Sequence, residues 1–194
     1  MTKGLKLWND LAFEFLRELR AMSPEQLKKF WGTRSDRTAS YLGKKDGILP
    51  RIAMKMGMRF KAEHMRFDGE FYREGDDGFP EVFVEVENKA TDIARSELEN
   101  LCYLRAPLKL VITVSMGPEQ DKALKSQWLK DVKDCQQKWL KESPEVVYGF
   151  IIGEVKWEDT DQGKRKGLKF HLFAASPDGE IVVKERDEVV GWFS

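Results

Sequence analysis

The sequence predicts an α/β domain in which a mixed central sheet is flanked by helices. Residues 81–89 alternate apolar and charged side chains with the period of two that a strand requires. Residues 109–114 form a β-branched apolar run, typical of an interior strand that is covered on both faces. Several other segments repeat apolar residues at three- and four-residue steps, which indicates helices around these strands.

Length and composition favour a single globular domain. The chain has 194 residues, of which 41% are hydrophobic, so it is long and apolar enough to bury a core. Its 33 basic and 33 acidic residues cancel, and any nucleic-acid contact must therefore come from local patches. Cys102 and Cys135 fall in predicted helices, and we interpret both as buried apolar residues of a reducing compartment.

Residues 1–50 are predicted to be a mainly helical part of this domain. Residues 5–21 carry one apolar stripe, and the segment from Ser23 to Gln26 supplies an N-cap, a proline at the first helical position and a glutamine at the third. This start is amphipathic, and no apolar run reaches membrane-spanning length. We therefore expect a soluble, cytoplasmic protein with no membrane partner.

The polar stretch 32–51 is the least regular part of the chain, and two interpretations of it stay open. It is either an ordinary solvated connection or a basic loop beside a nucleic-acid cleft. In the second interpretation the phosphate contacts come from four residues: Arg34, Arg37, Lys44 and Lys45.

The middle of the chain predicts three strands, a helix and a fourth strand. Residues 57–64 and 66–73 alternate apolar and polar side chains, as strands do. A Gly-Asp-Asp-Gly turn follows, and residues 81–89 form the third predicted strand. Thr91-Asp92 caps a helix that ends before Pro107, and the strand at 109–114 is expected to pair parallel with its neighbour. The two runs around the turn are expected to form a hairpin that brings Asp68 near Glu87.

The last third predicts the longest helix followed by strands. The helix starts at Gly117-Pro118 and leads to a buried strand at 146–152, and residues 168–174 and 180–184 are expected to be antiparallel. Residues 159–167 are expected to form a polar loop, whose basic triplet from Lys164 to Lys166 either contacts phosphate or keeps a hairpin tip soluble. His171 is assigned no role.

The order of helix, three strands, helix and strand resembles the PD-(D/E)XK nuclease superfamily. The residues that carry the resemblance are Phe67-Asp68-Gly69 and Glu87-Asn88-Lys89. It covers roughly residues 58–115 and implies a restriction-endonuclease-like αβββαβ core, with residues 116–194 adding the long helix and extra antiparallel strands. It implies a nuclease that acts on nucleic acid, with DNA the expected substrate.

The chemistry of these residues is consistent with that function. Phosphodiester hydrolysis needs a hard divalent cation, and Mg2+ (or Mn2+) prefers carboxylates together with water and phosphate oxygens. Asp68 and Glu87 would supply the carboxylates, Asn88 would add its backbone carbonyl, and Lys89 would act on the attacking water or stabilise charge on the phosphate.

Three further residues are candidates for the same site. Glu85 leaves the same face of its strand as Glu87, and two interpretations stay open: it either joins the site or pairs with a basic residue on the next strand. Glu99 and Tyr103 have the spacing of the Gln-x-x-x-Tyr element in one branch of the superfamily, with glutamate in place of glutamine. The alternative is a catalytically inactive module of this fold that binds a protein partner or nucleic acid; a homodimer is also open.

Overall fold

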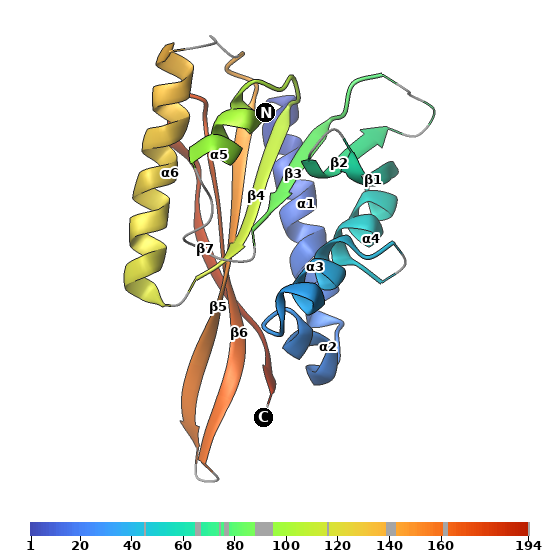
Figure 1. The fold of residues 1–194 in the computed structure, drawn as a ribbon, viewed down its shortest axis with the longest axis vertical. Coiled ribbons are helices and arrows are strands. Elements are labelled where there is room, and N and C mark those ends of the chain that lie inside the picture. The colour runs from blue at the N-terminus through green and yellow to red at the C-terminus, as the bar shows by residue number, and fades with distance from the viewer. Residues whose placement is uncertain are drawn as a thin grey trace.

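The computed structural model of the chain describes residues 1–44, 46–64, 67–73, 75, 78–87, 95–115, 117–138, 143–160 and 163–193. Within them the protein forms one seven-stranded mixed sheet with helices on both faces (Figure 1). The strands lie side by side in chain order: β1 Met58–His64, β2 Phe67–Arg73, β3 Val82–Val86, β4 Leu108–Val114, β5 Val147–Thr160, β6 Gly163–Ala175 and β7 Ile181–Phe193. The helices are α1 Lys3–Arg20, α2 Pro24–Lys29, α3 Arg34–Leu42, α4 Ile48–Lys55, α5 Arg95–Cys102 and α6 Pro118–Lys138.

The type of pairing between neighbouring strands changes twice across the sheet. Strands β1 to β3 pair antiparallel, β3 to β5 pair parallel, and β5 to β7 pair antiparallel again. Helices α5 and α6 lie in the two connections between the parallel strands, as a parallel pair requires. Every residue of β4 is buried, which suits its central place. The predicted α/β class with a mixed sheet is confirmed.

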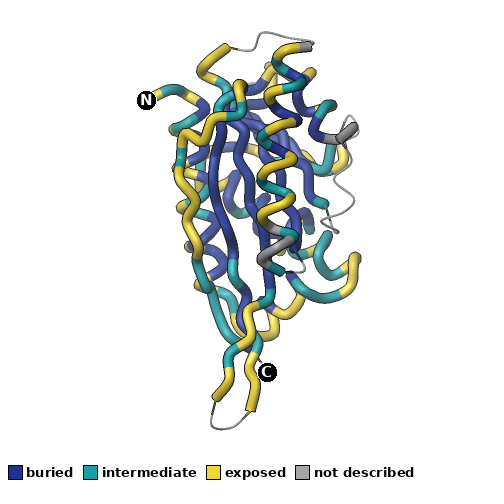
Figure 2. Tube along the Cα trace, turned by 90° about the vertical axis from the view of Figure 1, so that its left-hand side faces the viewer, coloured by how far each residue is buried: buried dark blue, intermediate teal, exposed yellow. Residues whose placement is uncertain are grey.

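Two apolar cores lie on the two faces of the sheet. The larger one is formed with α1 to α4, and the second with α5 and α6; Figure 2 shows the buried central strands between these layers. In the larger core, a Cβ atom on Gly149 would lie 2.4 Å from the Trp8 ring, so glycine lets α1 approach β5 closely. In the second core, Trp128 stacks on Phe150 with ring centroids 5.1 Å apart.

The polar stretch 32–51 is not irregular, and this expectation was wrong. It contains α3 and α4. Thr33 and Asp36 form a reciprocal capping box, in which each side chain accepts a hydrogen bond from the other residue's backbone N–H. The charged residues around Thr33 made the start of α3 difficult to recognise in the sequence. Helix α4 is stabilised by burial of Ile48 and Leu49 against the larger core.

The three C-terminal strands are much longer than expected. The predicted polar loop 159–167 is largely strand, because β5 and β6 continue as a paired ribbon down to Thr160 and Gly163. Figure 1 shows this ribbon extending beyond the rest of the sheet. Its distal part is exposed on both faces, so it lacks the apolar alternation by which strands are found in a sequence.

Helix α6 is the longest described helix, as predicted. It covers the second core with a stripe that includes Trp128, Val132 and Cys135. Among the residues that the structure describes, no helix is both long and apolar enough to cross a membrane.

Candidate functional site

Asp68 and Glu85 lie together where the pairing of β2 with β3 ends. The last paired residues are Gly69 and Val84, and continuing the register by one residue places Asp68 opposite Glu85. Oδ2 of Asp68 accepts a hydrogen bond of 2.7 Å from the backbone N–H of Val86. The Asp68 carboxyl also shares a hydrogen bond with the side chain of Glu85. Two carboxyl groups are therefore in direct contact at the carboxyl end of β3.

The pKa of Asp68 is raised above that of an exposed aspartate. Burial is the largest cause, and the nearby charge of Glu63 acts in the same direction. The bonds to Val86 and Glu85 and the positive charge of Arg34 oppose this rise without cancelling it. Two adjacent carboxyl groups in such a place either hold a proton between them or need a cation.

Glu87 follows directly after β3 and extends this acidic group along the chain. Its backbone N–H donates to the carbonyl of Ile112 at 2.8 Å, and its own carbonyl accepts from Thr113 Oγ1 at 3.2 Å. Val84 and Val86 point into the larger core, so the alternation directs Glu85 and Glu87 to the opposite face, on the side of α5 and α6. Asn88 and Lys89, the other predicted site residues, lie outside the described residues.

Of the basic residues predicted to contact phosphate that the structure describes, Arg34 is the one whose charge acts on Asp68. Arg34, the first residue of α3, is exposed and close enough for its charge to act on Asp68. Arg37 donates to the carbonyl of Gly32 at 2.7 Å, which gives it a local structural role. Lys44 is exposed, and Lys45 lies outside the described residues.

Glu99 and Tyr103 are separate from the Asp68 group. Glu99 is half-buried on α5 and contributes to raising the pKa of Cys135 on α6. Tyr103 is 48% exposed and lines a cavity of about 930 Å3 with Phe79 and Arg105. This cavity lies at the amino ends of β3 and β4, because Glu81 and Pro107 also line it, whereas Asp68 contacts the carboxyl end of β3.

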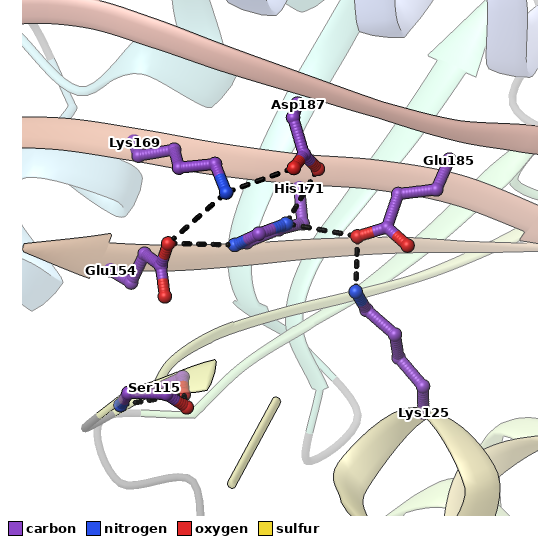
Figure 3. Close-up of polar contacts among 8 residues, drawn as sticks. Ser115, Lys125, Glu154, Lys169, His171, Glu185 and Asp187 are labelled. Atoms are coloured by element: carbon purple, nitrogen blue, oxygen red, sulfur yellow. Dashed lines mark hydrogen bonds and ion pairs between the residues drawn. The ribbon is translucent and has the colours of Figure 1, made fainter. Parts of the chain in front are cut away.

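A second polar group, which the sequence did not predict, surrounds His171 on β6 (Figure 3). The imidazole is only 5% exposed. Its Nδ1 lies 2.6 Å from Asp187 Oδ1 and 2.9 Å from Glu185 Oε1, both on β7. Its Nε2 lies 3.1 Å from Glu154 Oε1 on β5. We call His171, Glu154, Glu185 and Asp187, with the two lysines described next, the His171 cluster.

Two lysines balance part of the negative charge in the His171 cluster. Lys169 lies 2.9 Å from Asp187 Oδ2 and 3.3 Å from Glu154 Oε1, and Lys125 of α6 pairs with Glu185 Oε1. Partial burial alone would raise the pKa of Asp187, but Lys169 and His171 hold it below its usual value. Burial opposes the charge of Lys169, yet its two acidic partners raise its pKa.

Both polar groups lie on the α5–α6 face of the sheet. The strand registers align Thr113, Ile152, His171 and Asp187 across four strands, and continuing the β3–β4 register adds Glu87 to this row. Sequence alternation alone would have placed Lys169 and His171 on one face of β6. It would not have shown that acids on β5 and β7 face them, because residues 185–193 were not predicted to be a strand.

Comparisons with known proteins supply no function for this arrangement. No protein-family model and no curated protein sequence matches the chain. Solved structures that match include the central domain of yeast acetyl-CoA carboxylase, with 12% sequence identity and a TM-score of 0.31. That match covers 71% of this chain and 25% of the carboxylase chain. At this low TM-score the similarity carries no argument, so function must be argued from the geometry.

Proposed function

We propose that the protein is a metal-dependent nuclease that hydrolyses phosphodiester bonds in nucleic acid, with DNA as the expected substrate. The observation that carries the proposal is the contact between the carboxyl groups of Asp68 and Glu85 beside the end of β3, with Glu87 two residues further along. Three acids within one hairpin, partly withdrawn from water, are a donor set suited to a hard divalent cation.

The order and direction of the strands support this proposal. Helix α4 is followed by three antiparallel strands, then by α5 and by β4, which returns parallel to β3. This is the order implied by the resemblance to the PD-(D/E)XK superfamily. The proposal is also supported by the positions of two acids, Asp68 near the start of β2 and Glu85 near the end of β3.

The acidic residues fit Mg2+ or Mn2+ by their chemistry. Oδ2 of Asp68 already accepts a hydrogen bond from the backbone N–H of Val86. The candidate ligands are therefore the other oxygen of Asp68 and the carboxylates of Glu85 and Glu87, and the backbone carbonyl of Asn88 would be a further ligand. When bound, the cation would supply charge neutralisation at the phosphate. Burial raises the pKa of Asp68, which means that it disfavours the charged carboxylate, and a bound cation would offset this cost.

The surrounding residues have complementary roles in this proposal. Lys89 would orient or help to deprotonate the attacking water, and its charge would stabilise the phosphate as negative charge builds up on it. Arg34 would contact a neighbouring phosphate, because it is exposed and already close enough to act on Asp68. Substrate binding would thus depend on a local patch, consistent with a chain of zero net charge.

A nuclease assay tests the proposal. The purified protein is incubated with single-stranded DNA, duplex DNA and RNA, in Mg2+ or Mn2+ and then in chelator. We expect cleavage that chelator stops and that Asp68→Asn and Lys89→Ala abolish. Glu145→Gln, an exposed acid far from β3's carboxyl end, is the matched control and should leave cleavage unchanged. If the wild type and Lys89→Ala leave every substrate equally intact, the protein is not a nuclease.

A catalytically inactive module that binds a protein partner or nucleic acid is the second candidate. The hydrogen bond from Val86 to Asp68 favours it, since it gives this acid a structural task that requires no metal. Titration calorimetry with Mg2+ and Mn2+ separates the two candidates. Binding that disappears in Asp68→Asn and Glu87→Gln supports the enzyme, whereas no binding in the wild type supports the module.

A further inference from the structure

We propose that His171, Glu185 and Asp187 form a binding site for a divalent cation of the zinc class, supported from behind by Glu154. This site is separate from the acids at the end of β3 and does not depend on nuclease activity. The imidazole carries the inference more than the acids do. It is almost fully buried, and both of its ring nitrogens face carboxylate oxygens.

The Nδ1 side of the ring presents three ligand atoms to one point. Oxygens of Glu185 and Asp187 lie 2.9 and 2.6 Å from Nδ1, and the three atoms all lie within 4.8 Å of one another. A single N–H has one good direction for a hydrogen bond, and two oxygens compete for it. A tetrahedral zinc ion with bonds near 2.0–2.1 Å separates its ligands by about 3.4 Å, so each of the two oxygens needs to move away from Nδ1 by less than about 1 Å.

The Nε2 side of the ring faces a carboxylate. Glu154 Oε1 lies 3.1 Å from Nε2 but outside hydrogen-bond geometry, and a small rotation of the ring would let Nε2 donate to it, as histidine ligands donate to the carboxylates behind them. Lys169 contacts the same oxygen of Glu154 and also Asp187 Oδ2, and so leaves Asp187 Oδ1 directed at Nδ1. Figure 3 shows Glu154, Glu185 and Asp187 around the imidazole, with Lys169 bridging Glu154 and Asp187.

The kind of cation follows from the donor atoms and from access. One imidazole nitrogen and two carboxylates suit Zn2+ or Co2+, whereas Mg2+ prefers ligands that are all oxygen. Glu185 and Asp187 are exposed on β7, so an ion can reach them and retain water in a fourth position. The bound ion would fasten β7 to β6.

Lys125 supplies the sharpest test, because it pairs with Glu185 Oε1, one of the proposed ligand atoms. A cation must displace this lysine. Removing the lysine should therefore strengthen metal binding, although it removes a contact from the cluster. A purely structural ion-pair network predicts no such gain.

The experiment is calorimetric titration of Zn2+ into the chelator-treated protein, repeated with Co2+ and visible absorption. At this site we expect one ion per chain, no binding in His171→Ala, and binding about 10–100-fold weaker in Glu154→Gln. Lys125→Ala should bind more tightly, and Lys130→Ala, on the exposed side of the same helix, should match the wild type. The double variant Asp68→Asn/Glu87→Gln should keep its Zn2+, which separates this result from the fate of the nuclease proposal.

Three results would overturn the inference. The first is no stoichiometric Zn2+ binding by the wild type, which would leave the His171 cluster as a network of ion pairs without a metal. The second is unchanged or weaker binding in Lys125→Ala. This result does not depend on whether the His171→Ala variant folds correctly. The third is a cobalt spectrum with thiolate charge-transfer absorption, which would assign the ion to Cys102 or Cys135.

Discussion

The carboxylate of Asp68 accepts a hydrogen bond of 2.7 Å from the backbone N–H of Val86, at the point where β2 and β3 stop pairing. A side chain thus satisfies a donor at the end of the hairpin. The same carboxyl contacts Glu85 and is the first acid of the proposed metal site. Asp68 has a structural task and a proposed chemical one, and substitutions can separate them.

Asp68→Asn and Asp68→Ala should differ in stability but not in activity. The asparagine oxygen can still accept from Val86, so we expect unfolding free energy within about 0.5 kcal/mol of wild type. Alanine leaves that N–H without its partner and should cost about 1–3 kcal/mol. Both variants lose the carboxylate, so cleavage should fall at least about 100-fold. Urea unfolding and the nuclease assay measure the two effects; equal stability of the two variants would contradict the structural role.

The raised pKa of Asp68 predicts the direction of a pH effect on stability. As pH rises through the ordinary aspartate range, the unfolded chain releases this proton before the folded chain does. The wild type should therefore lose stability relative to Asp68→Asn until the raised pKa is passed, after which the difference stays constant. Urea unfolding of both proteins in chelator, from about pH 4 to about pH 7, measures it. A difference that moves the other way would mean that the ionised form is the one favoured by folding.

The elements that set the fold were predictable where burial leaves a periodic signal. The apolar run of β4, the alternation in β3 and the stripe of α6 each identified an element. Turn residues after Arg73 identified the hairpin that places Asp68 beside β3. Helix α3 was missed because its sequence is highly charged, although Thr33 and Asp36 have the spacing of a capping box and could have indicated its start.

The His171 cluster was not predictable because it depends on register between distant segments. Glu154, His171 and Asp187 come from three strands, and neither local periodicity nor composition fixes how those strands align. Strand β7 is largely exposed and interrupted by shifts of register, so it gives no clean alternation. The hairpin was expected to bring Asp68 near Glu87, whereas the register of β2 with β3 places Asp68 opposite Glu85, two residues earlier on the same face.

Gly149→Ala should destabilise the protein through α1. The added methyl group would lie 2.4 Å from the ring of Trp8, which is 1% exposed and held by the larger core. We expect a cost of about 1–3 kcal/mol from overpacking. Trp8→Ala should cost about 3–5 kcal/mol by the opposite effect, a cavity under α1. Thermal or urea unfolding measures both. An alanine at 149 that leaves stability unchanged would show that α1 can shift away from β5.

The thiols of the native protein should react slowly with a disulfide reagent at neutral pH. Burial raises the pKa of Cys135 to about 12, and the neighbouring Cys102 adds to the rise. Only the thiolate attacks a disulfide, and both side chains are also shielded from the reagent between α5 and α6. Two thiols should react rapidly in guanidinium and essentially none without it, and Cys102→Ala and Cys135→Ala assign each signal. A fast native thiol that disappears in Cys135→Ala would mean that α6 opens from the sheet, since burial is the main reason for that residue's inertness.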